Sequence, residues 1–309
     1  MSGVLCLGEA LIDAVDQNGE VTEIVGGSLL NVAAGLTALG HEATVGCWIG
    51  QDDRGDLIKQ YAADRKVALA EGSDAATKTP VAFAKIDAAG HADYTFDLEW
   101  DLPSLDDIQG YEHVHTGSIG ATLEPGGTKV VAAIKAVTNA TISYDPNARP
   151  ALMESPEHVL ARVEEIVALS DVVKASDEDL GWLYPGRSYE EVCRDWITRG
   201  PRLMVVTRGP DGAAVFVAGD DELHEMSTLP VVVNDTVGAG DSFMAGFISG
   251  LLDEGLLGGA AEREALAKAT WADVVPAVER AIGTSTVTVG RAGAYGPSHD
   301  EIAEALARR

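Results

Sequence analysis

The residues best suited to chemistry stand together in VNDTVGAGDSFMAGFISGLL (233–252), a glycine-rich turn followed by a helix-forming segment. Gly238, Ala239 and Gly240 stand where this helix would begin, so their unpaired backbone N–H groups and the helix dipole favour an anion such as a phosphoryl group. Asp241 follows in the first turn, where a carboxylate can take the proton of a hydroxyl that attacks a phosphoryl group. The alternative is that Asp241 only caps the helix.

Such a turn must be held by a framework, and strand-like and helix-like segments alternate along most of the chain. Apolar residues recur at helical spacing through 28–40, where Gly40 ends the pattern. Short apolar runs typical of buried strands are 4–10, 43–50, 113–117, 141–145, 171–175 and 203–207. The alternation predicts an α/β fold with a central, mostly parallel sheet and helices on both faces.

Two stretches, 13–25 and 80–100, instead alternate with a period of two, and the second contains a turn near Ala89-Gly90. We interpret them as a small antiparallel β lid attached to the main sheet. Because long linkers, low-complexity tracts and repeats are missing from the sequence, residues 1–309 are expected to form a single domain that carries this lid. An open edge of the lid sheet would suit a homodimer, because such edges are usually covered.

Composition limits the class of protein and its partners. The formal net charge is −27, from 49 acidic against 22 basic residues, so neither nucleic acid nor an anionic membrane is an expected partner. The start of the chain shows no basic leader, and we expect a cytoplasmic enzyme. The three cysteines, Cys6, Cys47 and Cys193, have no metal-site spacing and are expected to be buried free thiols.

The segment DTVGAGDSF (235–243) resembles the DTxGAGD signature of the ribokinase-like (PfkB) sugar kinases. Further matches to that family follow one another in the family's order and cover essentially the whole chain. They are Gly26-Gly27 with Asn31, Gly50-x-Asp52-x-x-Gly55, Asp145-Pro146-Asn147 with Arg149, Lys174-x-Ser176, Thr207-x-Gly209-x-x-Gly212 and Gly293-Ala294. A Walker A motif is missing from the sequence, as is a GxGxxG after the first strand, which argues against a P-loop kinase and a dinucleotide-dependent oxidoreductase.

The resemblance implies a ribokinase-like fold and a role for each matching residue. Asp241 would be the catalytic base, and the N–H groups of Gly238, Ala239 and Gly240 would stabilise the γ-phosphoryl group of ATP during transfer. The positions that would hold the sugar are Asp13, Gly27, Asn31 and Arg149. The alternative for Asn31 is a polar residue that only closes the start of a helix.

The resemblance also implies a nucleotide site, made by Lys174, Thr207, Gly209 and Gly212. The alternative for residues 207–212 is a plain turn between two strands, and Arg208 would either reach phosphate or lie in solvent. A non-catalytic sugar- or nucleotide-binding protein on the same fold is the rival from another class. Its mark would be loss of the base, and Asp241 is present.

For Mg²⁺, the family's Asn/Ser-x-x-Glu segment corresponds to Ser176 followed by Glu178 and Asp179, with Asp where Glu is usual. Either carboxylate would hold Mg²⁺ through water. A K⁺ site near Asp235, Val237 and Gly293 is left open, because Pro297 replaces a serine that some relatives supply.

The pattern of matches is closest to fructokinases, and fructose is the expected sugar. The segment TFDLEWDLP (95–103) places Asp97, Glu99 and Asp101 in the region between lid and domain, without the basic residue that a sugar acid would need. These carboxylates favour a neutral sugar over an anionic one. The alternatives are a 2-keto-3-deoxygluconate kinase and a ribokinase.

Overall fold

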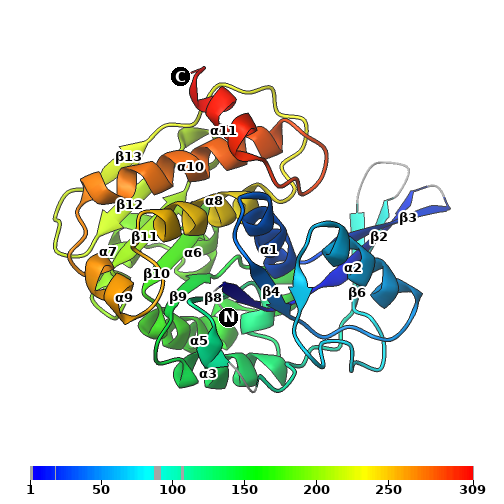
Figure 1. Cartoon of the computed structure of the whole chain (residues 1–309). Helices are drawn as coiled ribbons and strands as arrows, with labels where there is room; N and C mark the ends of the chain where they lie inside the picture. Colours follow the sequence, from blue (N-terminus) through cyan, green and yellow to red (C-terminus); the bar gives the residue numbers. More distant parts are fainter. Residues whose placement is uncertain (1–2, 18, 87–91, 106–107, 309) are drawn as a thin grey trace.

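A nine-stranded sheet crosses the molecule and bears helices on each side (Figure 1). The computed structural model describes residues 3–17, 19–86, 92–105 and 108–308. The strand order is β13-β12-β11-β10-β9-β8-β1-β4-β5, in which only β12 and β13 pair antiparallel with their neighbours. The strands are β1 Val4–Leu7, β4 Ala43–Gly46, β5 Ala68–Leu69, β8 His113–Gly117, β9 Thr141–Asp145, β10 Val172–Ser176, β11 Leu203–Thr207, β12 Ala213–Val217 and β13 His224–Met226.

The helices fall into two layers, one on each face of this sheet (Figure 1). Their bounds are α1 Ser28–Ala38, α2 Asp53–Asp64, α3 Gly126–Ala136, α4 Pro150–Met153, α5 Pro156–Leu169, α6 Asp177–Leu183, α7 Tyr189–Ile197, α8 Ala239–Asp253, α9 Ala260–Leu266, α10 Trp271–Val289 and α11 His299–Leu306. Three short 3₁₀ segments are η1 Ile108–Gly110, η2 Ile119–Ala121 and η3 Gly209–Asp211.

Alternation along the strands divides the core into two apolar clusters. In β1, Val4 and Cys6 pack with α1, α8 and α10, whereas Leu5 and Leu7 pack with α3, α5 and α7 on the other face. All four of these side chains are buried, as expected for a parallel strand covered on both sides. The predicted α/β architecture is therefore confirmed.

The small sheet predicted from period-two alternation is also present, with the order β3-β2-β6-β7. Its strands are β2 Leu11–Gln17, β3 Glu20–Gly26, β6 Val81–Ile86 and β7 Ala92–Asp97. The two hairpins β2–β3 and β6–β7 are antiparallel, but β2 and β6 pair in parallel at the centre. The turn expected near Ala89-Gly90 lies outside the described residues. We refer to this four-stranded sheet as the lid.

One expectation from composition concerns the interior. Cys6, Cys47 and Cys193 are buried free thiols, as predicted, and burial raises the pKa of the Cys47 thiol to about 12. Within the described ranges, none of the helices combines the length and the apolar character that a membrane-crossing segment requires.

Candidate active site

The glycine-rich turn before α8 has the geometry of an anion-binding helix start. Gly238 precedes the helix with φ 74°, a left-handed conformation that glycine adopts without strain. A Cβ atom at Gly238 would also lie 2.6 Å from Ala294 Cβ. The N–H of Ala239 donates to Thr236 O (3.2 Å) within this turn, and Ala239 does not line the cavity that Gly238 and Gly240 line. The backbone N–H of Ala239 is therefore used within the turn, and the N–H groups of Gly238 and Gly240 remain the candidates for binding an anion.

Asp241, in the first turn of α8, is held by residues from the other end of the chain. Ser28 Oγ donates to Asp241 Oδ1 (2.6 Å), and Asn31 Nδ2 donates to Asp241 Oδ2 (2.8 Å). The side chain is only 8% exposed. The carboxylate thus receives donors from α1 rather than serving only as a cap for α8.

The lid, α1 and the start of α8 enclose a cavity of about 600 Å³, the substrate cavity. The predicted site residues among its lining are Asp13, Gly27, Asn31, Arg149, Gly238, Gly240 and Asp241. Ala82 and Phe96 of the lid line the same cavity. The lid therefore faces the 238–241 segment, as the prediction of a lid over the sugar requires.

The Gly26-Gly27 pair lets the chain turn from β3 into α1 close to β1. Gly27 has φ 115°, and a Cβ atom there would lie 2.5 Å from the carbonyl oxygen of Glu9. A larger residue would move the start of α1, and with it Ser28 and Asn31, away from Asp241. The glycine therefore positions the two donors on the carboxylate.

Two charged groups of opposite sign face the cavity from its two walls. Asp13 on β2 is exposed to the open cavity. Loss of solvent around its carboxyl raises the pKa of this group, and the positive charge of Arg149 opposes that rise. Arg149, just before α4, donates through Nη1 to Asn147 Oδ1 (2.6 Å). The carboxylate and the guanidinium offer an acceptor and several donors to a polyhydroxylated ligand.

Asn31 contributes a free acceptor as well as its bond to Asp241. Its Oδ1 is buried and makes no hydrogen bond to the described part of the chain. A buried acceptor without a partner is costly, and a ligand hydroxyl in the cavity would supply the missing donor. This arrangement suits a sugar-binding role better than the alternative of closing a helix start.

Lys174 lies behind the anion site instead of lining the cavity. Its Nζ pairs with Asp145 Oδ2 (2.9 Å), and the two side chains are 4% and 2% exposed. Burial raises the pKa of Asp145 to about 6, and Lys174 opposes that rise. Burial lowers the pKa of Lys174, but the nearby carboxylates of Asp145, Asp179 and Asp241 together raise it above its ordinary value. A Cβ atom on Gly240 would lie 3.2 Å from Lys174 Nζ. Lys174 thus places a buried positive charge directly behind Gly240, and its contact with nucleotide stays a prediction.

The other residues assigned to the nucleotide lie at the same sheet edge but outside the substrate cavity. Thr207 ends β11, Gly209 begins η3 and Gly212 precedes β12. Thr228 Oγ1 donates to Pro210 O (3.1 Å), which ties this loop to the segment after β13. The guanidinium of Arg208 pairs with the Glu225 carboxylate (2.6 Å), so it neither lies free in solvent nor faces the substrate cavity.

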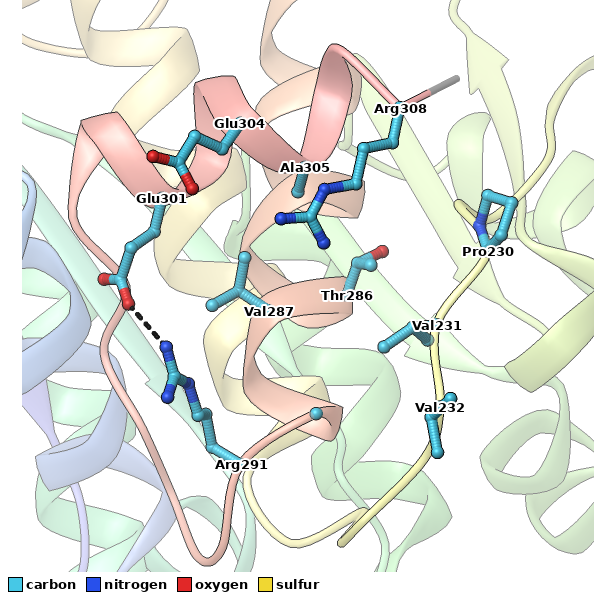
Figure 2. A pocket seen from close by; sticks show the side chains of 11 residues that line it. Pro230, Val231, Val232, Thr286, Val287, Arg291, Glu301, Glu304, Ala305 and Arg308 are labelled. Atoms are coloured by element: carbon cyan, nitrogen blue, oxygen red, sulfur yellow. Dashed lines mark hydrogen bonds and ion pairs between the residues drawn. The ribbon is translucent and has the colours of Figure 1, made fainter.

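A second cavity, of about 650 Å³, lies between the segment after β13, the end of α10 and α11 (Figure 2). Val231 and Val232 form one wall, and Arg291 pairs with Glu301 (3.2 Å) across from them. The segment is unusually apolar for its exposure, with Val232 89% exposed. It leads into the turn that contains Gly238.

The two candidates for Mg²⁺ differ in environment. Asp179 is buried, and its oxygens accept from Ala148 N (2.7 Å) and Ser176 N (2.9 Å), the second bond being part of a capping box at the start of α6. Glu178 beside it is exposed. The described residues contain no group of three or more acidic, His or Cys side chains arranged for a metal. Of the two carboxylates, Glu178 is the more accessible, and the role of either in binding Mg²⁺ stays a prediction.

Comparison with known proteins places this geometry in a family. The model of the pfkB family carbohydrate kinases matches residues 1–301. The chain belongs to this family. A fructokinase of Rhizobium leguminosarum bv. trifolii is 31% identical over 269 residues, which cover 82% of this chain and 81% of the relative.

Solved structures of pfkB-type fold agree along the full length. A double mutant of Vibrio cholerae O395 fructokinase, bound to fructose, ADP and potassium ion, superimposes with a TM-score of 0.79 at 27% identity, covering 99% of this chain and 98% of that one. Xylella fastidiosa fructokinase with bound ATP gives a TM-score of 0.82 at 23% identity and 98% coverage of both chains, and shows the shared fold. The ribokinase-like fold is therefore established. As a member of the carbohydrate kinase family, the chain is a phosphotransferase that acts on a sugar hydroxyl.

Several polar residues of this kinase's cavity received no role from sequence, among them Glu9, Ser28 and Asn147. Glu9 is buried and accepts from Ser28 N (3.2 Å) and Gly120 N (3.0 Å), and burial raises the pKa of its carboxyl against these hydrogen bonds. Ser28 and Asn147 line the same cavity. An ionisable residue inside an apolar strand segment was the available signal for Glu9, whereas Ser28 looks like any residue at a helix start.

The prediction that Asp97, Glu99 and Asp101 face the sugar is wrong for this kinase. Asp97 pairs with Lys78 (2.5 Å), Glu99 accepts from Trp48 Nε1 (3.4 Å), and Asp101 pairs with Lys129 (2.6 Å). None of the three is among the residues that line the substrate cavity. The charged groups that face a ligand in this cavity are instead those of its lining, such as Asp13, Arg149 and Asp241.

Proposed function

We propose that this chain is a fructokinase, which transfers the γ-phosphoryl group of ATP to a hydroxyl of fructose. The observation that carries the proposal is the Asp241 carboxylate, which lies beside the anion-binding turn and at the wall of a cavity that also presents Asp13, Asn31 and Arg149. The fructokinase names of the relatives support the choice of sugar.

In the proposed mechanism, Asp241 accepts the proton of the attacking sugar hydroxyl as the new O–P bond forms. The bond between the γ-phosphorus and the β–γ bridging oxygen breaks in the same transfer, and ADP leaves. The N–H groups of Gly238 and Gly240 donate to the phosphoryl oxygens, and the buried Lys174 adds positive charge behind them. Asp13 and the free Oδ1 of Asn31 accept from sugar hydroxyls, and Arg149 donates. Closure of the lid excludes water from ATP.

Mg²⁺ would be held through water by Glu178 or Asp179, where it would neutralise phosphate charge. A K⁺ site is a further element of the proposal. Asp235 accepts from Val237 N (3.0 Å) and Gly293 N (2.8 Å), so its carboxylate joins the two loops whose carbonyl groups would bind K⁺.

The screen that tests the proposal measures ADP formation with Mg²⁺-ATP and a panel containing fructose, ribose and 2-keto-3-deoxygluconate. The cavity lining contains three carboxyl side chains, those of Glu9, Asp13 and Asp241, and one guanidinium, that of Arg149. An extra sugar carboxylate should cost about 1–3 kcal/mol there, or roughly 5- to 150-fold. We expect kcat/KM for fructose to exceed that for 2-keto-3-deoxygluconate by at least about tenfold.

Asp97→Asn is the matched control, because Asp97 lies outside the cavity and should leave this ratio unchanged. Asp13→Asn should narrow the ratio by removing a charge that faces the sugar. A keto acid that is the better substrate would contradict fructokinase activity while leaving kinase activity intact.

The adenine of ATP is proposed to cover the exposed valines near Gly238, namely Val231, Val232, Val233 and Val237. Val232→Asp should raise KM for ATP about fivefold, because it puts a negative charge beside a polyanion at a cost of about 1 kcal/mol. Leu57→Asp, the same kind of change at a 47% exposed site on α2, should not alter KM for ATP. An unchanged KM in both variants would remove these valines from the nucleotide site.

The remaining partners are proposals of the same kind. The edge strand β3 exposes Val21 and Ile24, by 51% and 57%, so a homodimer through the lid would cover apolar surface. Light scattering would test this. The strong negative charge argues against nucleic acid and membrane partners, and dependence on ATP suits a cytoplasmic location.

A further inference from the structure

A chain of hydrogen bonds leads from the cavity wall to the carboxylate of Asp241. Arg149 Nη1 donates to Asn147 Oδ1 (2.6 Å), and Asn147 Nδ2 donates to Ser28 Oγ (2.9 Å). Ser28 Oγ in turn donates to Asp241 Oδ1 (2.6 Å). Four side chains from three distant parts of the sequence are therefore joined in one line, which we call the Ser28 relay.

The chemistry of its two ends fixes the direction of every bond in the relay. A guanidinium only donates and an ionised carboxylate only accepts. Because Ser28 donates its one hydrogen to Asp241, it can only accept from Asn147, so the Asn147 amide turns its NH₂ group to Ser28 and its oxygen to Arg149. Arg149 Nη1 also donates to the carbonyl oxygens of Asn147 and Ala148. The Ser28 oxygen is then an acceptor on one side, and its single hydrogen points at Asp241.

The centre of the relay is buried and anchored independently of its hydroxyl. Ser28 is 7% exposed and Asp241 8%. The backbone N–H of Ser28 donates to the buried Glu9 carboxylate (3.2 Å), which holds the start of α1 in place. Hydrogen bonds to a charged group in such surroundings are the strong ones, so the Ser28 hydroxyl is well placed to control the carboxylate.

We propose that Ser28 is a positioning residue for the catalytic base, and that Asn147 keeps its hydrogen directed at Asp241. With Ser28 on Oδ1 and Asn31 on Oδ2, the carboxylate is held at both oxygens and cannot rotate. Fixed orientation of the base toward the attacking hydroxyl accelerates transfer without tightening substrate binding. The inference rests on the proposed role of Asp241 as base.

The first test is Ser28→Ala, assayed with the sugar that the wild-type enzyme phosphorylates best. We expect kcat to fall about 10- to 100-fold while KM for sugar and ATP stays within about threefold. Ser28→Thr, which restores a hydroxyl, should recover most of the loss. Thr37→Ala removes a hydroxyl from the same helix, where it only donates to Ala34 O, and should leave kcat unchanged.

The sharper test is Asn147→Asp, which keeps size and shape but reverses the relay. Asn147 has φ 38°, a conformation that Asp also tolerates. An aspartate still pairs with Arg149 but offers Ser28 a second acceptor, which competes with Asp241 for the single Ser28 hydrogen. We expect a loss in kcat similar to that of Ser28→Ala, and little further loss when the two changes are combined.

Crystal structures of the variants give a readout that does not depend on turnover. The Asp241 carboxylate plane should rotate in Ser28→Ala and Asn147→Asp, and keep its orientation in Thr37→Ala. The relay would be overturned if Ser28→Ala or Asn147→Asp left the carboxylate plane unrotated, kept kcat within threefold of wild type, or changed only KM. Full additivity of the two substitutions would overturn it as well. Failure of the wild-type enzyme to phosphorylate any panel sugar would overturn the proposed function instead, and the carboxylate orientation would still decide the relay.

Discussion

Replacement of Asp241 by Asn should lower kcat at least about 10²-fold, the usual scale for losing a general base. The amide cannot accept the proton of the sugar hydroxyl, yet it fits the same space. Its oxygen can still accept from Ser28, and Asp13 and Arg149 remain in the cavity lining to hold the sugar. Fold and sugar binding should therefore persist, and calorimetry of fructose binding would show this.

A matched control exists on the same helix. Asp253, the last residue of α8, pairs with Arg280 (2.5 Å) far from the cavity. Asp253→Asn should keep kcat within about twofold of wild type, because it changes only a partly exposed ion pair. Turnover near that of wild type in the Asp241 variant would end the assignment of the base.

The local features of this site were readable from sequence because short-range rules determine them. Glycines before a helix and a carboxylate in its first turn have limited structural meanings, and so Gly238, Gly240 and Asp241 lie where the pattern put them. Period-two alternation likewise predicted the lid, although pairing between β2 and β6 is parallel. No local rule specifies how two separate hairpins join.

Sequence is least informative where a side chain's direction depends on distant partners. Residues 98–103 follow β7 without regular structure, so periodicity does not tell which way Glu99 and Asp101 point, and both turn to partners outside the cavity. Lys174 lies on a buried strand, but its partner Asp145 is 29 residues away in sequence. Ser28 acquires its importance only when α1 and α8 come together, 213 residues apart.

The buried pair of Lys174 and Asp145 gives the largest expected effect on stability. Lys174→Met removes the charge with little change of volume and leaves Asp145, 2% exposed, without its partner. Breaking a buried pair in this way should reduce the free energy of unfolding by about 3–5 kcal/mol near pH 8. Urea unfolding would measure this. Lys135→Met, which removes half of an exposed pair with Glu165, should cost at most about 1 kcal/mol.

The dependence of this loss on pH follows from the pKa of Asp145. Burial already holds it at about 6 in the folded protein, and Lys174 is the main influence that lowers it, so the pKa should rise further in Lys174→Met. A carboxyl whose pKa is higher in the folded than in the unfolded state favours folding when protonated, and this contribution is lost as pH rises through the folded pKa. The deficit of the variant should therefore be small near pH 5.5 and grow toward about pH 8. Adding Asp145→Asn should restore most of the stability and remove this pH dependence, because no buried charge is left unpaired. A deficit of equal size at both pH values, or one that the second substitution does not relieve, would mean that packing rather than charge makes Lys174 important.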